Sequence, residues 1–305
     1  MLRRHASGGS SNVLAESANE KRPVTESSTL DPLLFPTVDI ALARRLERAE
    51  AMANAASVDS RCECQPDVGA EWTEVAGVYA MFDGPASPLT QTFGLGLFEP
   101  FLAAEFDQIE AFFGRRGAST FHEVSSFAAP ETLLLLSERG YSPIEASTVL
   151  VRPTSATSFA EAGEIAVRTI ASSETAKWSR VAADAWGSES PEIRPFIEEI
   201  GGVVARARGV TCFIAEREGE PIATAALNVQ NGIALLAGAA TIPSARRQGA
   251  QRELLRSRLA FAATQGIELA MVVTQPGSAS QRNAERQGFR PVYTRAKWQR
   301  LNPAH

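Results

Sequence analysis

The stretch Gly238-Ala-Ala-Thr-Ile-Pro-Ser-Ala-Arg-Arg-Gln-Gly-Ala-Gln-Arg-Glu-Leu254 joins an apolar run to an amphipathic run through a short turn that contains arginine and glycine. Residues 233–242 are almost wholly apolar, which predicts a buried strand. Apolar residues recur at helical spacing from Leu254 onward, so we expect a helix to begin near Gly249. The fold should therefore contain a strand, a tight turn and a helix in direct succession.

A turn that opens a helix is well suited to bind phosphate. The first N–H groups of a helix have no intrahelical partner, and the aligned peptide dipoles place partial positive charge at that end. Gly249 has no Cβ and lets an anion approach the backbone. Arg246, Arg247 and Arg252 add positive charge around the same point. We therefore expect a phosphorylated ligand at this turn.

This stretch resembles the coenzyme A loop of the GNAT-type N-acetyltransferases, which reads Val-x-Pro-x-x-Arg/Gln-x-x-Gly-x-Gly/Ala between a strand and a helix. Thr241, Pro243, Arg246 and Gly249 carry the resemblance. Two positions depart from the pattern: Thr241 stands where the family usually has Val, and Gln251 stands where it has the last Gly or Ala. The resemblance implies that acetyl-CoA is the cofactor.

The resemblance extends over about residues 165–301. The predicted elements around the loop are two helices over 173–185 and 191–204, a hairpin of strands over 211–216 and 221–229, a strand over 269–275, a helix over 278–287 and a final strand over 292–300. The family strand splays from its neighbour beside the loop, and Gly238 is a plausible place for a bulge. The implied cofactor contacts are Ala240, Thr241, Ile242, Arg246, Arg247, Gln248, Gly249, Ala250 and Gln251, together with Ser280 and Asn283.

The catalytic groups are less defined. Many members of the family carry a Tyr four residues before the Gly of a closing Gly-Phe, but Ala284 stands there. The candidate catalytic residues are Ser280, Asn283, Tyr293 and Glu216. A solvated helix position explains Ser280 and Asn283 equally well, whereas packing in the core or substrate pocket is favoured for Tyr293 and solvation for Glu216. Trp186 is a candidate wall of the acceptor pocket or a core residue. We therefore expect transfer to depend on placing a neutral amine against a thioester polarised by a backbone N–H.

The first half of the chain repeats part of the residue pattern of the second half. Gly117 and Gly140 frame a strand and a helix, as Gly266 and Gly288 do, with offsets of 149 and 148 residues. Such self-similarity indicates a duplicated fold, although chance similarity between two α/β segments is the alternative. Residues 96–101 stand in place of the phosphate loop and include no basic residue. The first copy should therefore not bind coenzyme A in the same way.

These patterns predict an α/β protein with two GNAT-like mixed-sheet domains in tandem. Residues 1–34 are expected to form a disordered N-terminal tail, 35–152 a degenerate GNAT-like domain and 153–305 an acetyl-CoA-binding GNAT domain. In the first of these domains we expect a helix over 36–56 and strands over 75–82 and 90–97.

Composition excludes several classes of protein. The 305 residues carry a net charge of −5, yet residues 239–305 hold eleven Lys or Arg against three Glu, which suits an anionic cofactor. A nucleic-acid partner would require aromatic residues among these charges, so none is expected. No apolar run suits a membrane helix and no secretory signal is evident, so we expect a cytoplasmic protein. Cys62 and Cys64 make an incomplete metal site, and no metal is expected.

The sequence thus predicts an N-acetyltransferase that moves an acetyl group from acetyl-CoA to a primary amine. The acceptor is a small-molecule or peptide amine, and the oligomeric state stays open. The alternative is a non-catalytic acyl-CoA-binding or regulatory GNAT-like module. A nucleotide-phosphate hydrolase is excluded, because no Lys-Ser/Thr follows Gly249.

Overall fold

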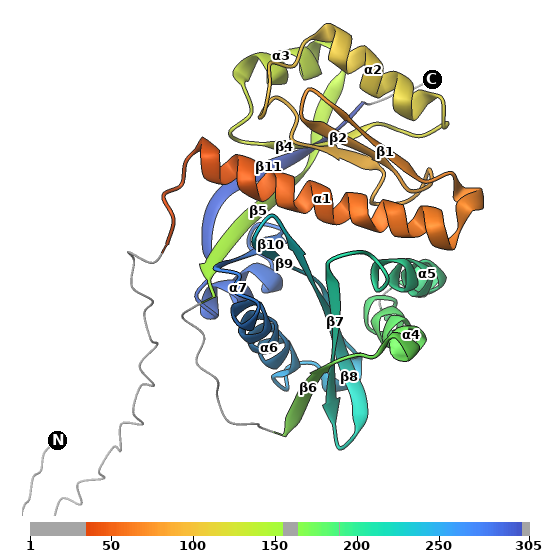
Figure 1. Ribbon diagram of the computed structural model, residues 1–305, viewed down its shortest axis with the longest axis vertical. Coiled ribbons are helices and arrows are strands. Elements are labelled where there is room, and N and C mark those ends of the chain that lie inside the picture. Colours follow the sequence, from red (N-terminus) through yellow and green to blue (C-terminus); the bar gives the residue numbers. More distant parts are fainter. Residues whose placement is uncertain (1–34, 155–163, 189, 301–305) are drawn as a thin grey trace, which may run out of the picture.

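The computed structural model describes residues 35–154, 164–188 and 190–300, so the tail expected over 1–34 lies outside the described residues. The described residues form a single eleven-stranded mixed sheet and seven α-helices (Figure 1). The predicted mixed α/β class is therefore confirmed. The two halves of the chain do not have separate sheets, because strands from both lie in the same one.

The second half of the chain follows the predicted order of elements. A two-residue turn joins the hairpin, and both its residues, Glu218 and Gly219, have positive φ (52° and 84°), as a tight hairpin turn requires. The elements are β6 (Ile165–Thr169), α4 (Thr175–Trp186), α5 (Arg194–Val204), β7 (Val210–Arg217), β8 (Glu220–Gln230), β9 (Ile233–Thr241), α6 (Ala250–Thr264), β10 (Leu269–Thr274), α7 (Ala279–Arg286) and β11 (Arg290–Arg300).

The first half differs from its predicted elements at three places. The strand expected over 75–82 is a hairpin, because Ala76 and Gly77 have positive φ and reverse the chain. The strand expected over 90–97 is short, since Gly94 and Gly96 also have positive φ. The opening helix ends later than expected. The elements are α1 (Ile40–Cys64), β1 (Glu71–Val75), β2 (Val78–Phe82), β3 (Gln91–Phe93), α2 (Ala103–Gly114), β4 (Phe121–Ser125), α3 (Pro130–Glu138) and β5 (Tyr141–Pro153).

The final strands of the two halves are exchanged within the sheet. The strand order is β1-β2-β3-β4-β11-β5-β10-β9-β8-β7-β6. Strand β11 is antiparallel to both β4 and β5, and β5 is antiparallel to both β11 and β10. A cut between residues 152 and 153 would therefore divide the chain but not the sheet.

The order and pairing of elements repeat on the two sides of this exchange. Strand β3 is antiparallel to β2 and parallel to β4, and β9 is antiparallel to β8 and parallel to β10. A helix follows β3 and β9 in each case, as α2 and α6, and another precedes each final strand, as α3 and α7.

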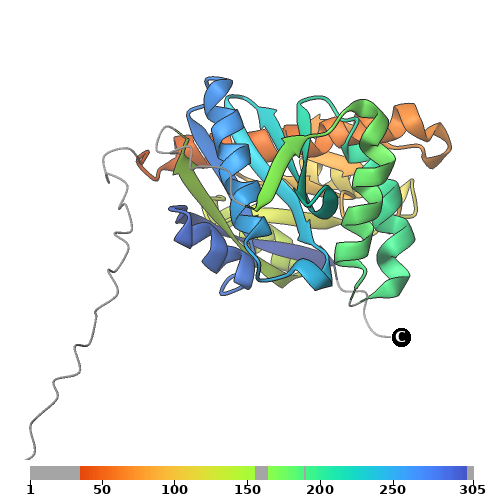
Figure 2. The ribbon, with the colours of Figure 1, turned by 90° about the horizontal axis from the view of Figure 1, so that it is seen from below.

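Helix α1 lies between the two halves (Figure 1). Its buried Leu42 and Leu46 share a core with Val149 of β5, Ile233 of β9 and Met271 of β10. On the other face of the second half, α6 buries Leu254 and Leu259 against β8 and β9. Figure 2 shows α4 and α5 side by side, and α5 contacts α1.

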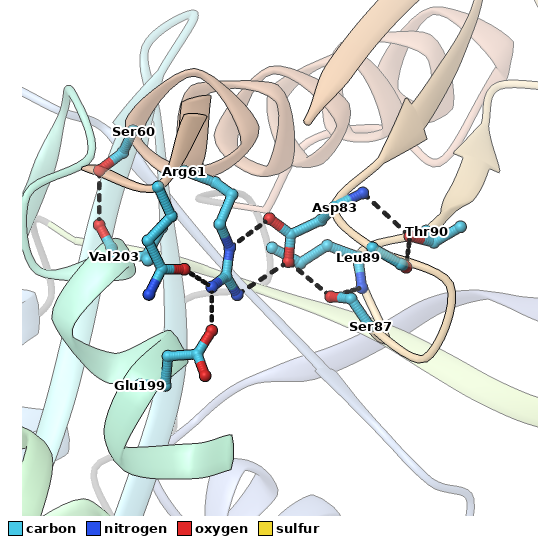
Figure 3. A network of polar contacts seen from close by, with 10 residues as sticks. Ser60, Arg61, Asp83, Ser87, Leu89, Thr90, Glu199 and Val203 are labelled. Atoms are coloured by element: carbon cyan, nitrogen blue, oxygen red, sulfur yellow. Dashed lines mark hydrogen bonds and ion pairs between the residues drawn. The ribbon is translucent and has the colours of Figure 1, made fainter. Parts of the chain in front are cut away.

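Polar contacts of Arg61 and Ser60 join the C-terminal part of α1 to the loop after β2 and to α5 (Figure 3). The Arg61 guanidinium is 2% exposed and donates from Nε to Asp83 Oδ1 at 2.9 Å and from Nη2 to Asp83 Oδ2 at 3.2 Å. It also contacts Glu199 of α5, and Ser60 Oγ donates to the Val203 carbonyl at 2.8 Å. Breaking a buried pair typically costs about 3–5 kcal/mol, so Arg61 and Asp83 hold α1 firmly against the loop after β2. The contacts to Glu199 and Val203 join α5 to α1.

His122 of β4 is fully buried in the core of the first half. Its Nδ1 lies 2.8 Å from Thr92 Oγ1, and its ring lies against Phe106 and Tyr141. No carboxylate neighbours it in these contacts, and burial lowers its pKa to about 3. In the unfolded chain the His122 imidazole is therefore protonated near pH 6.5, whereas in the folded chain it stays neutral at that pH.

This difference predicts a loss of stability in acid that depends on His122. Between pH 7.5 and pH 5.5, it should lower the free energy of unfolding by about 1.4 kcal/mol, because only the unfolded imidazole is protonated in that range. Denaturant unfolding of the wild type and of His122→Gln at both pH values isolates the effect, since all other groups titrate in both proteins. Equal acid losses in the two proteins would contradict the assignment.

Candidate functional site

Strands β9 and β10 diverge beside the predicted loop. Their parallel pairing ends at Leu235 and Met271. Beyond that point β9 stays paired with β8 as far as Thr241, while β10 stays paired with β5 as far as Thr274. A V-shaped opening results, and backbone groups of β9 that face it are not bonded to β10. Such an edge can accept an extended ligand in the manner of an added strand.

A bulge lies in β9 at the start of the opening. Ala226 of β8 pairs with Ala237 and Thr224 pairs with Ala240, so two residues of β9, Gly238 and Ala239, lie opposite the single residue Ala225 of β8. Gly238 has a φ of 60°, which glycine adopts without strain. The predicted bulge at Gly238 is confirmed.

Arg258 of α6 is bound to the carbonyls that flank this bulge. Its Nη1 donates to the Ala226 carbonyl at 3.0 Å and to the Ala237 carbonyl at 3.3 Å. The side chain is buried, and burial lowers its pKa to about 9. The sequence reasoning missed this residue. The available signal was an arginine at a position where helical spacing from Leu254 and Leu255 calls for an apolar residue.

The turn between β9 and α6 has the expected helix start. Gly249 is the N-cap with a φ of 97°, and the first bond across it runs from Glu253 N to the Gly249 carbonyl at 3.1 Å. The N–H groups just before Glu253 are therefore directed out of the helix start. A Cβ at Gly249 would approach only Arg252, at 3.6 Å, so there is space for a side chain at this position. Glycine is favoured here because of the positive φ and not because of crowding within the protein.

The arginines of the turn have different roles. Arg246 Nη2 donates to Ser188 Oγ at 2.7 Å and to the Ala185 carbonyl at 3.3 Å, which joins the turn to the end of α4. Arg247 is exposed, and Arg252 donates to the neighbouring Glu253. The basic surface is smaller than the sequence count suggests, because Arg258 and Arg295 of the same region are buried.

The two residues that depart from the family pattern contact each other. Gln251 Nε2 donates to Thr241 Oγ1 at 2.8 Å, which joins the first turn of α6 to the last residue of β9. The longer side chain of Gln251 is therefore folded back toward the strand. This hydrogen bond requires both residues, since valine at 241 would offer no acceptor.

A pocket of about 280 Å³ lies at the mouth of the opening. Its lining residues are Ala185, Trp186, Ala239, Ala240, Thr241, Arg246, Gln251, Ser280 and Asn283. Most of the predicted cofactor residues are thus brought together around one space. The others, Ile242 and residues 247–250, form the turn and do not line this pocket.

Ser280 and Asn283 are the two catalytic candidates that reach the pocket, both exposed on α7. Tyr293 lies in the core, where its hydroxyl donates to Glu47 Oε1 at 2.8 Å. Burial, reinforced by the Glu47 charge, holds the pKa of this phenol well above its usual range. Ala284 is buried on the inner face of α7.

Glu216 lies at the end of β7 within a cluster of ion pairs. Its Oε1 is 2.9 Å from Arg168 and 3.6 Å from Lys177, and the hydrogen bonds from Arg168 lower its pKa. Such a carboxylate is a weak base, and it does not line the pocket. Neither Tyr293 nor Glu216, which the sequence offered as catalytic candidates, lines this pocket.

Metal ligands do not gather at this site. Within residues 35–154, 164–188 and 190–300, no group of three or more His, Cys, Asp or Glu side chains could hold a metal ion. In the same described ranges no helix combines the length and the apolar character needed to cross a membrane.

Several solved structures share the fold. A GCN5-related N-acetyltransferase from Kribbella flavida is 20% identical and has a TM-score of 0.57, with 81% of this chain and 96% of that chain covered. A conserved protein of unknown function from Staphylococcus epidermidis is 10% identical with a TM-score of 0.58, covering 77% of this chain and 96% of that one. A tandem GNAT protein from the clavulanic acid biosynthesis pathway is 11% identical with a TM-score of 0.54, covering 74% and 79%.

No curated protein matches the chain. The family model of the acetyltransferase (GNAT) family matches residues 171–289. This range includes α4, the splayed β9 and β10, the turn at Gly249 and the pocket-lining residues of α7. This segment is therefore similar to the GNAT acetyltransferase family in sequence, and the described residues share the fold of the solved GNAT structures.

Proposed function

We propose that this protein is an N-acetyltransferase that transfers the acetyl group of acetyl-CoA to a primary amine. The observation that carries the proposal is the junction of the V-shaped opening with the start of α6. Residues 239–241 of β9 and the first turn of α6 meet at the pocket that Ser280 and Asn283 also line. An extended pantetheine and a charged pyrophosphate need these two adjoining surfaces.

The proposed cofactor would lie along β9 with its pyrophosphate at the turn. The free N–H groups before Glu253 would donate to phosphate oxygens, and the helix dipole would favour the negative charge. The exposed Arg247 and Arg252 supply further positive charge. The backbone of residues 239–241 would bind the pantetheine amides and direct the thioester toward Trp186.

In the proposed reaction the neutral amine nitrogen attacks the thioester carbonyl carbon. A C–N bond forms, the C–S bond breaks, and the amine proton passes to solvent while the thiolate takes up a proton. A backbone N–H of β9 would stabilise the developing oxyanion. With Tyr293 in the core and Ala284 in place of the family Tyr, positioning would provide most of the acceleration.

We also propose that residues 35–152 and 153–305 are two GNAT-like units derived by duplication, of which only the second binds coenzyme A. The repeated pairing around β3–β4 and β9–β10 supports this division. In the first unit, Glu105 Oε2 accepts a hydrogen bond from Leu102 N at 3.0 Å at the start of α2. A carboxylate thus occupies the helix end that would otherwise attract phosphate.

Two measurements on the whole chain test the proposal. Calorimetry with coenzyme A reports cofactor binding, and release of the free thiol from acetyl-CoA across a panel of amines reports transfer. Binding together with amine-dependent release supports the enzyme. Tight binding without release at any pH would instead identify a non-catalytic acyl-CoA-binding module, and absence of binding would overturn the site.

Replacing Gly249 tests the phosphate position. Gly249→Glu should weaken coenzyme A binding at least about tenfold, or 1.4 kcal/mol, because a carboxylate would face the phosphates. Gly266→Glu is the matched control: Gly266 also has positive φ, at 70°, and follows the other end of α6. Calorimetry on both variants separates backbone strain from charge. Equal losses in the two variants would contradict the assignment.

The Thr241–Gln251 hydrogen bond should couple these residues in cofactor binding. Thr241→Val and Gln251→Ala should each weaken coenzyme A binding, while the double variant should lose less than the sum. We expect a coupling energy of about 0.5–1.5 kcal/mol, the usual net value of one hydrogen bond. Strict additivity of the binding free-energy changes of the three variants would show that the hydrogen bond does not contribute to the site.

The third test concerns proton transfer. Ser280→Ala, Asn283→Ala and Tyr293→Phe should each lower turnover by less than about 30-fold, because none of these residues is expected to act as a general acid. Removing a true general acid would cost about 10²–10⁴-fold. The rate should rise with pH as the free amine fraction grows. Two amines of different pKa provide the control, since the rising limb should move with the amine. A thousandfold loss in any variant would reveal a dedicated acid.

A further inference from the structure

A second cavity, of about 290 Å³, shares Trp186 in its wall with the cofactor pocket. Aliphatic and aromatic side chains of α4, α5 and β9 form most of its wall, among them Trp178, Ile200 and Leu235. Asn54, Ser57 and Asn228 are its polar lining residues, and none of the described lining residues is charged. The cavity is therefore suited to an uncharged apolar group.

The cavity adjoins the proposed reaction centre. Trp186, half exposed at the end of α4, lines both this cavity and the cofactor pocket. Strand β9 also passes from one to the other: Ala237 and Gly238 line the cavity, and Ala239 lines the pocket. The bulge at Gly238 thus lies at the boundary. A group bonded to the reacting carbonyl or nitrogen could extend past Trp186 into the cavity.

The first half of the chain forms part of the wall of this cavity. Ala53 and Ser57 of α1 contribute to the wall, and so does Leu89 from the loop after β2. The Leu89 N–H donates to Ser87 Oγ at 3.2 Å, and Ser87 Oγ donates to Asp83 Oδ2 at 2.6 Å (Figure 3). The Arg61–Asp83 ion pair therefore fixes the loop that carries Leu89.

We propose that this cavity binds an uncharged hydrocarbon group of a substrate while the transfer occurs beside Trp186. The inference rests on the proposed acyl transfer and specifies its substrate class. The group is either the apolar body of the amine acceptor or the chain of an acyl-CoA longer than acetyl. A polyamine or a charged peptide would leave water for a wall with no carboxylate, and its charges would lose their hydration.

Binding of an unreactive probe tests the cavity without requiring catalysis. Octan-1-ol should shift the tryptophan emission to shorter wavelength saturably, because Trp178 and Trp186 both line the cavity and the probe would replace water there. Each buried methylene should tighten binding about three- to fourfold, so hexan-1-ol should bind roughly tenfold more weakly. Absence of a saturable shift would overturn the proposal even if coenzyme A binds as proposed.

Filling the cavity provides the matched variant. Ala237→Leu places three more carbons into the space from an exposed strand position and should weaken octan-1-ol at least about tenfold. Ala166→Leu is the control, since Ala166 is likewise an exposed strand residue but lies on β6, outside the cavity. Coenzyme A calorimetry checks that both proteins are folded.

A second variant is available if Ala237→Leu does not fold. Trp186→Ala removes the wall that the cavity shares with the cofactor pocket and should also weaken the binding of octan-1-ol. Unchanged affinity for octan-1-ol in a folded cavity variant would overturn the proposal.

Turnover then distinguishes the two sources of the group. With acetyl-CoA held constant, KM should fall from butylamine to octylamine if the acceptor occupies the cavity. With one short amine held constant, KM should fall from acetyl-CoA to octanoyl-CoA if the acyl chain does. In either case Ala237→Leu should abolish the chain-length preference and Ala166→Leu should retain it. A preference in neither series, or one unaffected by Ala237→Leu, would show that the cavity does not bind substrate.

Discussion

The antiparallel pairing of β5 with β11 is the contact on which the rest of this structure depends. It links the final strands of the two halves at the centre of the sheet, and each strand then pairs with the other half on its second edge. The pairing also explains the opening at the site. Strand β10 is bonded to β5 up to Thr274, whereas β9 is bonded to β8 up to Thr241, so the two strands follow different neighbours and separate after Leu235.

The sequence predicted the elements whose causes are local. A glycine at a turn, an apolar run and helical spacing can each be recognised within a few residues of sequence. These patterns predicted β9, the turn at Gly249 and α6 correctly. The bulge at Gly238 and the two-residue turn at Gly219 belong to the same class. The hairpin at Ala76 was missed because alanine rarely adopts positive φ, and only the following glycine marked it.

The features that sequence did not predict depend on distant partners. The alternation of apolar and polar residues along β5 and β11 does not specify which half of the sheet each strand joins. Tyr293 appears near the site in sequence, yet β11 carries it into the first half's side of the sheet, where it contacts Glu47 of α1. Arg258 was treated as part of the basic surface, but it binds the carbonyls beside the bulge. Burial of both side chains follows from tertiary packing, which the local pattern does not contain.

The exchange of final strands has a consequence for how the chain folds as it is made. Strand β4 can complete its pairing only with residues 295–299, which are synthesised long after β4 itself. Until then the edge of β4 is open, and open strand edges are sites of aggregation. Contacts this distant in sequence also slow folding, because a long loop must close before they form. The N-terminal half therefore cannot complete its part of the sheet until β11 has been synthesised, and until then the nascent chain is a natural client for chaperones.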